Sequence, residues 1–401
     1  MKGWTTSKLS SLGFIQTGST PKTAVKENFG SFISFIKPAD FLPSGEIVSK
    51  SDEGLSEKGL VQSRLMAKGS VLMVCIGATI GKVGYTKVDV AANQQINSFT
   101  PSDKIITKFA YYAMTNDRFQ RSVIKSSGQA TLPIINKSKW SNLEISYPVN
   151  VAEQKRIVAI LDQAFDDIEQ ARAKTKQNLK NARELFESYL QQVFSQRGDG
   201  WVERKLSDVC EITSKLVDPR EEEYLDLPHI GAGNMISNTG KLIDIQTARE
   251  EGLISGKFVF DESMVLYSKI RPYLMKICRP DFIGLCSADV YPLCPIGEKI
   301  DKNYLFYLLL SKDFTDYAIA GSGRAGMPKV NRTHLFNYNI SIPCIEKQRE
   351  YAEKIDHIAE QTQALESIYE KKLAQLDELK KSILQKAFSG ELTKEQEGAA
   401  A

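Results

Sequence analysis

Residues 127–148 read SGQATLPIINKSKWSNLEISYP, and residues 322–343 read SGRAGMPKVNRTHLFNYNISIP. The two stretches begin 195 positions apart and share a glycine, a proline, an asparagine, a serine and a final proline. The matched pairs are Gly128 with Gly323, Pro133 with Pro328, Asn136 with Asn331, Ser146 with Ser341 and Pro148 with Pro343. A chain that contains the same device twice is expected to contain the same domain twice.

The match between the two copies extends over nearly the whole chain. GWTTSKLSSLGFI at 3–15 corresponds to GWVERKLSDVCEI at 200–212, and EQKRIVAILD at 153–162 corresponds to KQREYAEKID at 347–356. Each copy therefore consists of a globular part of about 145 residues and a helical part of about 40. A period this long excludes a solenoid and predicts duplicated domains related by pseudo-twofold symmetry.

The two helical parts repeat apolar residues every 3.5 positions, which is the pattern of a coiled-coil seam. The alternative is two amphipathic helices that pack on separate domains. We favour the coiled coil because both runs are long, their other faces are charged, and neither contains proline or glycine. The seam positions in the first part are Leu161, Phe165, Ile168, Arg172, Thr175, Leu179, Ala182, Phe186, Tyr189 and Val193. Those in the second part are Ile355, Ile358, Thr362, Leu365, Tyr369, Lys372, Leu376, Leu379 and Ile383.

The order of the segments along the chain determines how the helices pair. The first helix ends where the second globular part begins, and the second helix begins where that part ends. A paired second helix therefore has to run back toward the first globular part. We expect an antiparallel pair with the globular parts at its opposite ends, and about 42 residues at 1.5 Å each predict a rod of about 60 Å.

The globular parts combine strand and helix signals. Apolar runs interrupted by glycine indicate strands within 69–101 and 257–295, and helices are expected at 107–123 and 302–319. The predicted fold class is α+β: two similar globular domains joined by two long antiparallel coiled-coil helices, with pseudo-twofold symmetry. The predicted divisions are 1–150 (first globular domain), 151–196 (central helix), 197–343 (second globular domain), 344–390 (C-terminal helix) and 391–401 (flexible tail).

The charge of the chain is small overall but unevenly distributed. The formal net charge is +3, yet residues 1–150 contain 18 Lys and Arg against 10 Asp and Glu, whereas residues 197–345 contain 18 against 20. A protein that binds nucleic acid by charge alone is more basic than this. Either the chain does not bind nucleic acid, or partner proteins supply much of the contact with phosphate.

Signals for membrane insertion or secretion are not found in the sequence. The most apolar run, VLMVCIGATI at 71–80, lies between Lys68 and Lys82 and is too short for a membrane span, so it fits buried strands better. The N-terminal MKGWTTSKLSSLG has no apolar signal core. We therefore expect a cytoplasmic location.

Catalytic and metal-binding motifs are also not found. The sequence contains no Gly-x4-Gly-Lys-Ser/Thr loop, no S-adenosylmethionine loop and no Asn/Asp-Pro-Pro-aromatic motif. GAGN at 231–234 lacks the third glycine and the following helix of a nucleotide-binding loop. The six cysteines form no CxxC and the three histidines are scattered, which favours buried free thiols over a metal site. We expect a chain that is not an enzyme and holds no cofactor or metal of its own.

Ordered motifs give the chain a resemblance to a known family. The first copy contains FIKPADF, KGSVLMVCIGATIGKVGY, NQQINSF, SGQATLPIIN and EQKRIVAILD. The second copy contains HIGAGNM, VLYSKIRPYLMKI, CSADVYPL, SGRAGMPKVN, KQREYAEKID and LKKSILQKAFSGEL. This twice-repeated set resembles the specificity subunit of type I restriction-modification systems over residues 3 to about 393. Each globular part corresponds to a target-recognition domain of that family.

The resemblance implies a DNA-recognition role in anti-phage defence. Each target-recognition domain would read one half of a bipartite double-stranded DNA target, while the helices set the unread spacer and bind two methyltransferase subunits. Those subunits would bring S-adenosylmethionine and flip out and methylate an adenine. Motor-nuclease subunits with ATP and Mg²⁺ would add restriction. The residues expected in the coiled coil and against partners are Leu161, Phe165, Ile168, Leu179, Phe186, Tyr189, Ile355, Ile358, Leu365, Tyr369, Leu376 and Ile383.

DNA contacts are expected from polar loops of both domains, because Arg, Lys, Asn and Gln read base edges and other basic groups hold phosphate. Structural alternatives exist for several of these residues. Gln94 and Gln95 can cap strand ends, Tyr273 can belong to the core, and Arg271 can pair with Asp289. The candidates are Lys82, Lys87, Gln94, Gln95, Gln129 and Thr131 in the first domain, and Lys269, Arg271, Tyr273, Lys276, Ser287, Arg324 and Lys329 in the second.

Two other classes of function remain open from the residues alone. One is a protein-binding adaptor with two heads on a coiled coil, which predicts no affinity for DNA at low salt. The other is a recognition subunit of a different methylation-based anti-phage system, which differs only in its partners.

Overall fold

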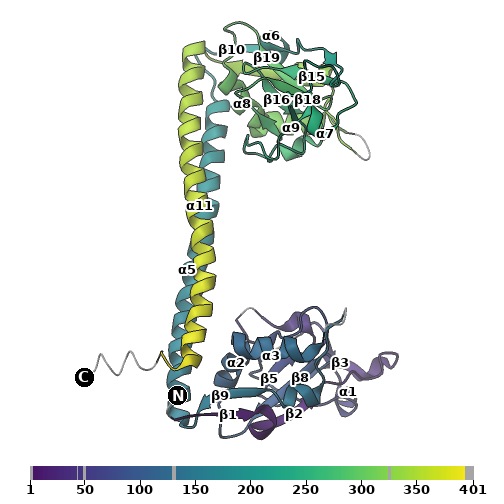
Figure 1. Cartoon of the computed structure of the whole chain (residues 1–401), viewed down its shortest axis with the longest axis vertical. Coiled ribbons are helices and arrows are strands. Elements are labelled where there is room, and N and C mark those ends of the chain that lie inside the picture. The colour runs from purple at the N-terminus through teal and green to yellow at the C-terminus, as the bar shows by residue number, and fades with distance from the viewer. Residues whose placement is uncertain (1–2, 43, 48–50, 129–131, 324–326, 393–401) are drawn as a thin grey trace, which may run out of the picture. The chain divides into compact units, whose positions relative to one another are not determined.

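The computed structural model describes residues 3–42, 44–47, 51–128, 132–323 and 327–392. The chain divides into two compact units: unit 1 comprises residues 1–175 and 371–401, and unit 2 comprises residues 176–370. Each unit contains one globular head, head 1 (1–150) or head 2 (197–343), and a stretch of each of two long helices (Figure 1). Within the described residues, no helix is long and apolar enough to cross a membrane. The long helices are α5 (Val151–Phe194) and α11 (Ile345–Ser389).

Head 1 is built on two sheets and a two-stranded ribbon within its described residues. Its strands are β1 (Trp4–Lys8), β2 (Gly13–Thr17), β3 (Phe29–Ile36), β4 (Gly54–Leu55), β5 (Val71–Val74), β6 (Val83–Tyr85), β7 (Ala91–Ala92), β8 (Ile96–Pro101) and β9 (Glu144–Pro148). Its helices are α1 (Glu57–Val61), α2 (Thr107–Thr115), α3 (Asp117–Ser127) and α4 (Lys137–Ser141), with 3-10 turns η1 (Leu9–Ser11), η2 (Lys26–Asn28) and η3 (Pro38–Asp40). The sheet orders are β2-β8-β5-β6 and β4-β3-β7, and the ribbon pairs β1 with β9.

Head 2 has a comparable set of elements. Its strands are β10 (Val202–Lys205), β11 (Cys210–Glu211), β12 (Leu216–Val217), β13 (Pro228–Ile230), β14 (Gln246–Thr247), β15 (Lys257–Phe260), β16 (Val265–Ser268), β17 (Ile277–Cys278), β18 (Gly284–Ser287), β19 (Val290–Pro295) and β20 (Asn339–Ile342). Its helices are α6 (Leu206–Val209), α7 (Ala248–Glu251), α8 (Lys302–Leu310), α9 (Lys312–Ala320) and α10 (Arg332–Phe336), with a 3-10 turn η4 (Pro272–Leu274). The sheet orders are β11-β19-β16-β17 and β12-β15-β18-β13-β14, and the ribbon pairs β10 with β20.

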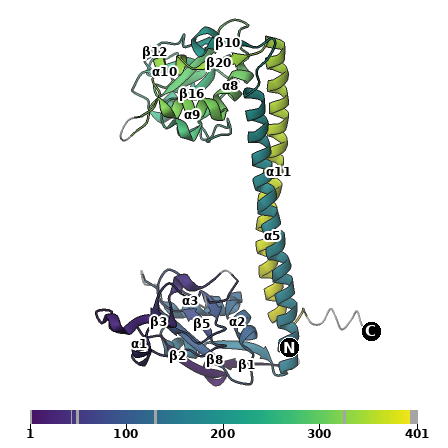
Figure 2. The ribbon, with the colours of Figure 1, turned by 180° about the vertical axis from the view of Figure 1, so that it is seen from behind.

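The strand pairings confirm the predicted α+β duplication. The order β2-β8-β5-β6 in head 1 corresponds to β11-β19-β16-β17 in head 2. The parallel pair β3–β7 corresponds to the parallel pair β13–β18, and in both heads the first strand pairs antiparallel with the last. Seen from both sides, α2 in unit 1 and α8 in unit 2 lie on the side of their head that meets the long helices (Figure 2).

The repeated asparagine of the opening stretches begins a short helix in each head. The Asn136 side chain accepts a hydrogen bond from the amide of Lys139 (2.8 Å) at the start of α4. The Asn331 side chain accepts one from the amide of His334 (2.8 Å) at the start of α10. Both residues are N-caps, which explains why the same residue type occurs at this place twice. The chain then enters the last strand of the head.

The predicted helices at 107–123 and 302–319 are each divided in two. Asn116 is extended between α2 and α3, and its side chain accepts a hydrogen bond from the amide of Arg118 (2.9 Å). Ser311 is extended between α8 and α9, and its hydroxyl accepts one from the amide of Phe314 (3.3 Å). Asn and Ser compete with the helical backbone for hydrogen bonds, so each ends one helix and caps the next.

The ends of the long helices are part of the head cores. In unit 1, the ring of Phe388 lies 5.3 Å from that of Phe109 and 6.4 Å from that of Trp4. In unit 2, the ring of Phe194 lies 5.0 Å from that of Tyr304. Burial of one such side chain stabilises a fold by about 2 kcal/mol. Each head is therefore completed by the last turn of a helix.

Within each unit, α5 and α11 run antiparallel. In unit 1, Arg172 pairs with Asp377 and Glu169 pairs with Lys380. In unit 2, Arg183 pairs with Glu366, while Gln196, just beyond the end of α5, accepts a hydrogen bond from Tyr351 near the start of α11. In both units, partners on α11 have lower numbers as the numbers on α5 rise.

The expected seam on α5 lies at buried or half-buried positions throughout, but the one on α11 differs at Leu365. Its side chain is 40% exposed, and the neighbouring Glu366 is turned toward α5, where it accepts a hydrogen bond from Arg183 (2.8 Å). The expected seam included Leu365 because it is apolar and lies three positions after Thr362. With 3.6 residues per helical turn, position 366 instead faces α5. Leu379 is likewise 47% exposed. Lys372, another expected seam position, is also exposed. The remaining expected seam residues are Ile355 (buried) and Ile358, Thr362, Tyr369, Leu376 and Ile383 (half-buried).

Candidate nucleic-acid interface

In head 1, the repeated stretch at 127–148 is hydrogen-bonded to the loop that joins β5 to β6. The amide of Gly77 donates to the carbonyl of Pro133 (3.0 Å), and the amide of Ile135 donates to the carbonyl of Cys75 (2.9 Å). Gly77 has a φ of +100°, a conformation that glycine adopts without a steric penalty. These bonds hold the two loops side by side, and Ala78, Thr79 and Leu132 of these loops are exposed.

Head 2 makes the same junction with different residues. The amide of Arg271, in the loop that joins β16 to β17, donates to the carbonyl of Pro328 (2.9 Å). The amide of Val330 donates to the carbonyl of Lys269 (2.9 Å). Arg271 therefore takes the place that Gly77 has in head 1. The prolines act through their backbone carbonyls, which agrees with a loop-shaping role.

The described candidates in head 1 already have partners within the chain. Lys82 donates to the carbonyl of Pro38 (3.3 Å), and the hydroxyl of Thr20 donates to the Gln94 side chain (2.5 Å). The Gln95 side chain accepts a hydrogen bond from the Asn93 side chain (2.9 Å), which fixes the turn before β8. Gln129 and Thr131 lie outside the described residues.

Lys87, the remaining candidate in head 1, forms an ion pair with Glu46. The two charged groups lie 2.5 Å apart, and the Lys87 side chain is 65% exposed. The hydrogen bond from Lys87 lowers the pKa of the Glu46 carboxyl. Head 1 thus uses one carboxylate to orient one lysine.

In head 2, one carboxylate takes two of the candidate lysines. Asp289 Oδ1 lies 3.2 Å from Lys269 Nζ and 3.3 Å from Lys329 Nζ. Burial of Asp289 favours its neutral form, but the hydrogen bonds from both lysines outweigh burial and lower the pKa of the carboxyl. Asp289 pairs with the two lysines, so the structural alternative in which it pairs with Arg271 is wrong.

The other candidate DNA-contacting residues of head 2 differ in exposure and in their hydrogen-bond partners within the chain. Tyr273 is 53% exposed, so it does not belong to the core. Lys276 donates to the carbonyl of Ala232 (2.5 Å), and the hydroxyl of Ser287 accepts from the amide of Asp289 (3.3 Å). Arg271 is exposed. Arg324 lies outside the described residues.

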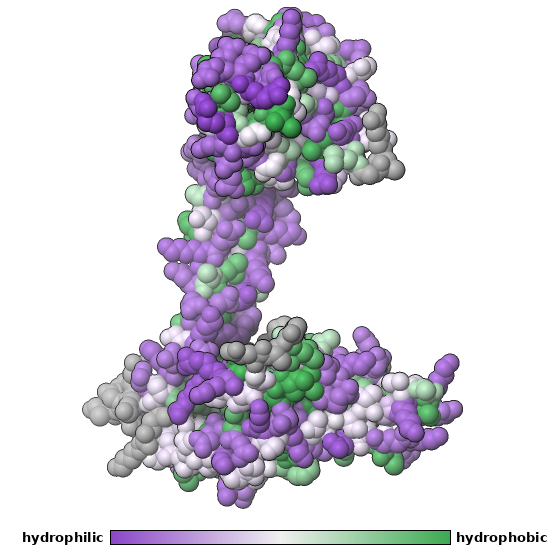
Figure 3. All heavy atoms as spheres, turned by 45° about the vertical axis from the view of Figure 1, so that its right-hand side comes forward, coloured by the Kyte–Doolittle hydropathy of each residue, from purple (hydrophilic) through white to green (hydrophobic). Residues whose placement is uncertain are grey.

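Two groups of surface residues were missed by the sequence reasoning. Arg332 contacts the same ring as Lys269: its guanidinium lies 5.7 Å from the centroid of the Tyr291 ring, and Lys269 Nζ lies 5.4 Å from it. Its place directly after the capping Asn331 was the available signal. Exposed apolar residues also occur at matched positions of the two heads, and hydrophobic residues are visible on the surface of both (Figure 3). These are Ile124 (55% exposed) with Ile319 (41%), and Leu132 (53%) with Met327 (44%).

A buried glutamine fastens each head to a long helix. Gln154 of α5 is fully buried, and its side chain accepts from the amide of Ile106 (3.0 Å) and donates to the carbonyls of Lys104 (2.8 Å) and Pro148 (2.9 Å). Gln348 of α11 does the same in head 2. It accepts from the amide of Asp301 (2.9 Å) and donates to the carbonyls of Lys299 (3.2 Å) and Pro343 (2.9 Å). The alignment of the two glutamines in the repeat was the signal for this role.

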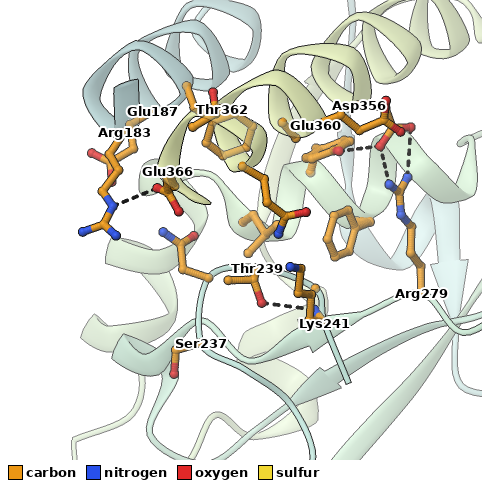
Figure 4. Close-up of a pocket in the computed structure, with 18 residues that line it drawn as sticks. Arg183, Glu187, Ser237, Thr239, Lys241, Arg279, Asp356, Glu360, Thr362 and Glu366 are labelled. Atoms are coloured by element: carbon orange, nitrogen blue, oxygen red, sulfur yellow. Dashed lines mark hydrogen bonds and ion pairs between the residues drawn. The ribbon is translucent and has the colours of Figure 1, made fainter. Parts of the chain in front are cut away.

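An aspartate two turns further along makes a second attachment. In unit 1, Asp162 accepts hydrogen bonds from Lys108 (2.6 Å) and Tyr112 (2.6 Å). In unit 2, Asp356 accepts from Arg279 and from Tyr307 (2.5 Å), at the edge of a cleft of about 570 Å³ (Figure 4). The labelled Arg183–Glu366 pair lies across this cleft from Arg279 (Figure 4).

The thiols and acidic groups do not form a metal site among the described residues. No group of three or more His, Cys, Asp or Glu side chains that could hold a metal ion occurs in that part of the chain. Burial raises the pKa of the Cys75 thiol to about 12, so this thiol stays protonated at neutral pH. Cys344 is the exposed cysteine, and Cys294 is half-buried.

Comparisons with known proteins agree with this duplicated architecture. The family model for the type I restriction modification DNA specificity domain matches residues 1–181 and 198–375. The chain is 28% identical over 326 residues to the type I restriction enzyme EcoDI specificity subunit of Escherichia coli, which covers 72% of this chain and 71% of that protein. It is 25% identical over 369 residues to the MjaIX specificity subunit of Methanocaldococcus jannaschii, with 85% and 83% covered.

Solved structures share the fold. A chain from work on complex assembly and conformational transition of the type I R-M system matches with a TM-score of 0.79 at 18% identity, covering 98% of this chain and 99% of that one. The HsdS subunit from Thermoanaerobacter tengcongensis matches with a TM-score of 0.63 at 19% identity, with 98% of each covered. With two copies of the specificity domain and specificity subunits as its relatives, the chain belongs to the family of type I restriction-modification DNA specificity proteins.

Proposed function

We propose that each head reads one half of a bipartite double-stranded DNA target and that the chain catalyses no reaction itself. The observation that carries this proposal is the junction of loops found twice: Gly77 bonded to Pro133 in head 1, and Arg271 bonded to Pro328 in head 2. The backbone arrangement is repeated while the side chains on it change. That combination suits two readers of different base sequences, because base edges are distinguished by side chains.

The charge distribution supports a shared mode of DNA binding. Head 1 has the excess of basic residues, whereas two cations of head 2, Lys269 and Lys329, are held by Asp289. Affinity for duplex DNA depends on the number of phosphates that a protein neutralises. Head 1 therefore supplies more of the phosphate contact, and partner subunits supply the remainder.

The long helices hold the two readers at a fixed spacing and bind two methyltransferase subunits. Their surface is mostly hydrophilic (Figure 3), but it includes exposed apolar side chains. Exposed apolar residues on a charged helix are typical of a protein contact. The partners bring S-adenosylmethionine, and motor-nuclease subunits with ATP and Mg²⁺ complete a restriction complex. The exposed apolar side chains are Leu185 (65%), Leu365 (40%), Ile368 (58%) and Leu379 (47%).

Methylation sequencing tests this proposal. DNA is sequenced for methyl-adenine from cells that express the chain together with the methyltransferase subunit proposed as its partner, and from cells without the chain. The expected result is a bipartite motif that depends on the chain. Insertion of one heptad into both α5 and α11 is expected to change the spacer and leave both half-sites unchanged. Identical methylation with and without the chain would instead favour a protein-binding adaptor.

A further inference from the structure

Arg271 occupies a backbone position at which its counterpart in head 1 is glycine. Gly77 has a φ of +100°, and Arg271 has a φ of +50°. Both amides donate to the carbonyl of the matched proline, Pro133 or Pro328. A residue with a Cβ atom pays a steric penalty in this left-handed region, and glycine does not. An arginine at this position therefore destabilises head 2 unless something offsets the cost.

The turn that contains Arg271 is held firmly. Pro272 is buried and begins the 3-10 turn η4, which is followed by Met275, a second non-glycine residue with positive φ (+49°). The amide of Leu274 donates to the carbonyl of Arg271 (2.9 Å), and Ile270 forms a β-bridge with Lys329. The backbone on both sides of Arg271 is thus fixed, and its side chain leaves a rigid support. Strained positions of this kind cluster at ligand-binding sites.

The neighbouring cations of head 2 are satisfied within the chain, and Arg271 is not. Lys269 and Lys329 pair with Asp289, and Lys276 donates to the carbonyl of Ala232. The exposed guanidinium of Arg271 has no hydrogen bond, ion pair or ring contact with any described residue. Within the described chain, nothing that this side chain does offsets the steric cost of its backbone.

We propose that Arg271 reads a guanine in the half-site of head 2, by donating two N–H groups to the O6 and N7 atoms in the major groove. This inference rests on the proposed function of head 2 as a DNA reader. The planar guanidinium matches the two acceptors of guanine, and this is the commonest specific contact between proteins and DNA. Base readout needs an accurately placed starting point for the side chain more than a phosphate contact does, and the fixed backbone of this turn supplies one. Head 1 has no side chain at Gly77, so the two half-sites differ at this contact.

The test begins with Arg271→Gly, which installs the residue of head 1 and removes the steric penalty, so that loss of folding cannot explain the result. Asp244→Gly is the matched control. Asp244 also lies in head 2 and has a positive φ (+49°), and its replacement removes no basic residue. Methylation sequencing in cells with the proposed methyltransferase partner is expected to show one guanine of one half-site become degenerate in Arg271→Gly. The other half-site, and the whole motif in Asp244→Gly, should stay unchanged. An unaltered motif in Arg271→Gly overturns the inference.

Binding of the purified complex to modified DNA distinguishes base from phosphate. Replacing the identified guanine by 7-deazaguanine removes N7, and we expect about a 10-fold weaker binding by the wild type and no further loss by Arg271→Gly. Equal weakening on all sequences, with a salt dependence reduced by about one phosphate, would identify a phosphate contact and overturn the guanine assignment. If the wild type itself gives no bipartite motif, the proposed function fails and not only this inference.

Discussion

Heads 1 and 2 are each attached to a long helix by a glutamine at an equivalent position, but the ion pairs that add to this attachment differ. Gln154 and Gln348 bind one amide and two carbonyls each, at equivalent places. Asp162 binds a lysine and a tyrosine, whereas Asp356 binds an arginine and a tyrosine. A buried backbone group needs a partner of fixed length and geometry, while a half-exposed carboxylate accepts several donors. The contact with backbone is therefore the one that stays the same.

The largest expected effect comes from replacing the glutamines. Gln348→Leu leaves the amide of Asp301 and two carbonyls without partners in a buried site, and Gln154→Leu does the same to the amide of Ile106. Each change should cost about 3 kcal/mol locally, because an unpaired buried group costs about 1–3 kcal/mol. We expect hydrogen exchange at Asp301 or Ile106 to accelerate about 100-fold, only in the head that carries the substitution.

Gln363→Leu, at an exposed position of α11, is the control and should leave both amides protected. Loss of protection in both heads from one substitution would mean that the heads unfold together, and the comparison between two separate attachments would fail.

Replacing the aspartate of each attachment should destabilise the two heads to different extents. In unit 2, the side chains of Arg279 and Asp356 are 26% and 30% exposed; in unit 1, Lys108 and Asp162 are 37% and 32% exposed. The more buried pair leaves the more costly unpaired cation when its partner is removed. Asp356→Ala should therefore destabilise head 2 by about 2 kcal/mol and Asp162→Ala should destabilise head 1 by about 1 kcal/mol.

Hydrogen exchange of the core strands in each head measures both losses, and Glu360→Ala, at an exposed position one turn from Asp356, is the control. Equal losses in the two heads would show that the choice of arginine or lysine has no energetic consequence.

The repeat and the helices could be predicted from sequence because they depend on regular spacing. The matched Asn136 and Asn331, and the 3.5-residue pattern around Leu161, are visible in the letters alone. The sequence does not show which of several neighbouring side chains makes a given contact. Asp289 pairs with two lysines rather than with Arg271, and Glu366 rather than Leu365 faces α5. In both cases, distances between segments that are far apart in sequence determine which side chain makes the contact.

Alkaline pH should weaken both attachments. Burial, followed by the hydrogen bond to aspartate, raises the pKa of Tyr112 and of Tyr307 above the ordinary value. Because the protonated phenol is the form favoured in the fold, its contribution is complete below about pH 10 and is lost as the pH rises further. The slope is about 1 kcal/mol per pH unit for each tyrosine.

Arg279 partly opposes this effect in head 2, because its positive charge favours the phenolate of Tyr307. This opposition acts only at a pH high enough to ionise Tyr307 within the fold. Tyr112→Phe and Tyr307→Phe should therefore remove equal alkaline losses of stability, each from its own head, as measured by denaturant unfolding between pH 9 and about 11. A loss that persists in either variant would show that its phenol is not the titrating group.

The smallest expected effect on stability belongs to Asp289, and it sharpens the contrast between the reading loops. The lysines hold the pKa of Asp289 below its ordinary value, so the stabilising contribution is present above about pH 4 and is lost as the pH falls below that. Asp289→Asn should cost less than about 1 kcal/mol at neutral pH, because the site is partly exposed.

The same substitution should act in the opposite direction on DNA binding. Asp289→Asn releases Lys269 and Lys329 together, whereas Glu46→Gln in head 1 releases Lys87 alone. If the heads bind DNA as proposed, affinity for non-specific duplex DNA at low salt should rise several-fold in Asp289→Asn and less in Glu46→Gln, and the gain should vanish as salt is raised. Because one carboxylate restrains two cations in head 2, unchanged binding in Asp289→Asn would mean that these lysines face away from DNA. The reader in head 2 would then depend on Arg271 and its neighbours in the turn.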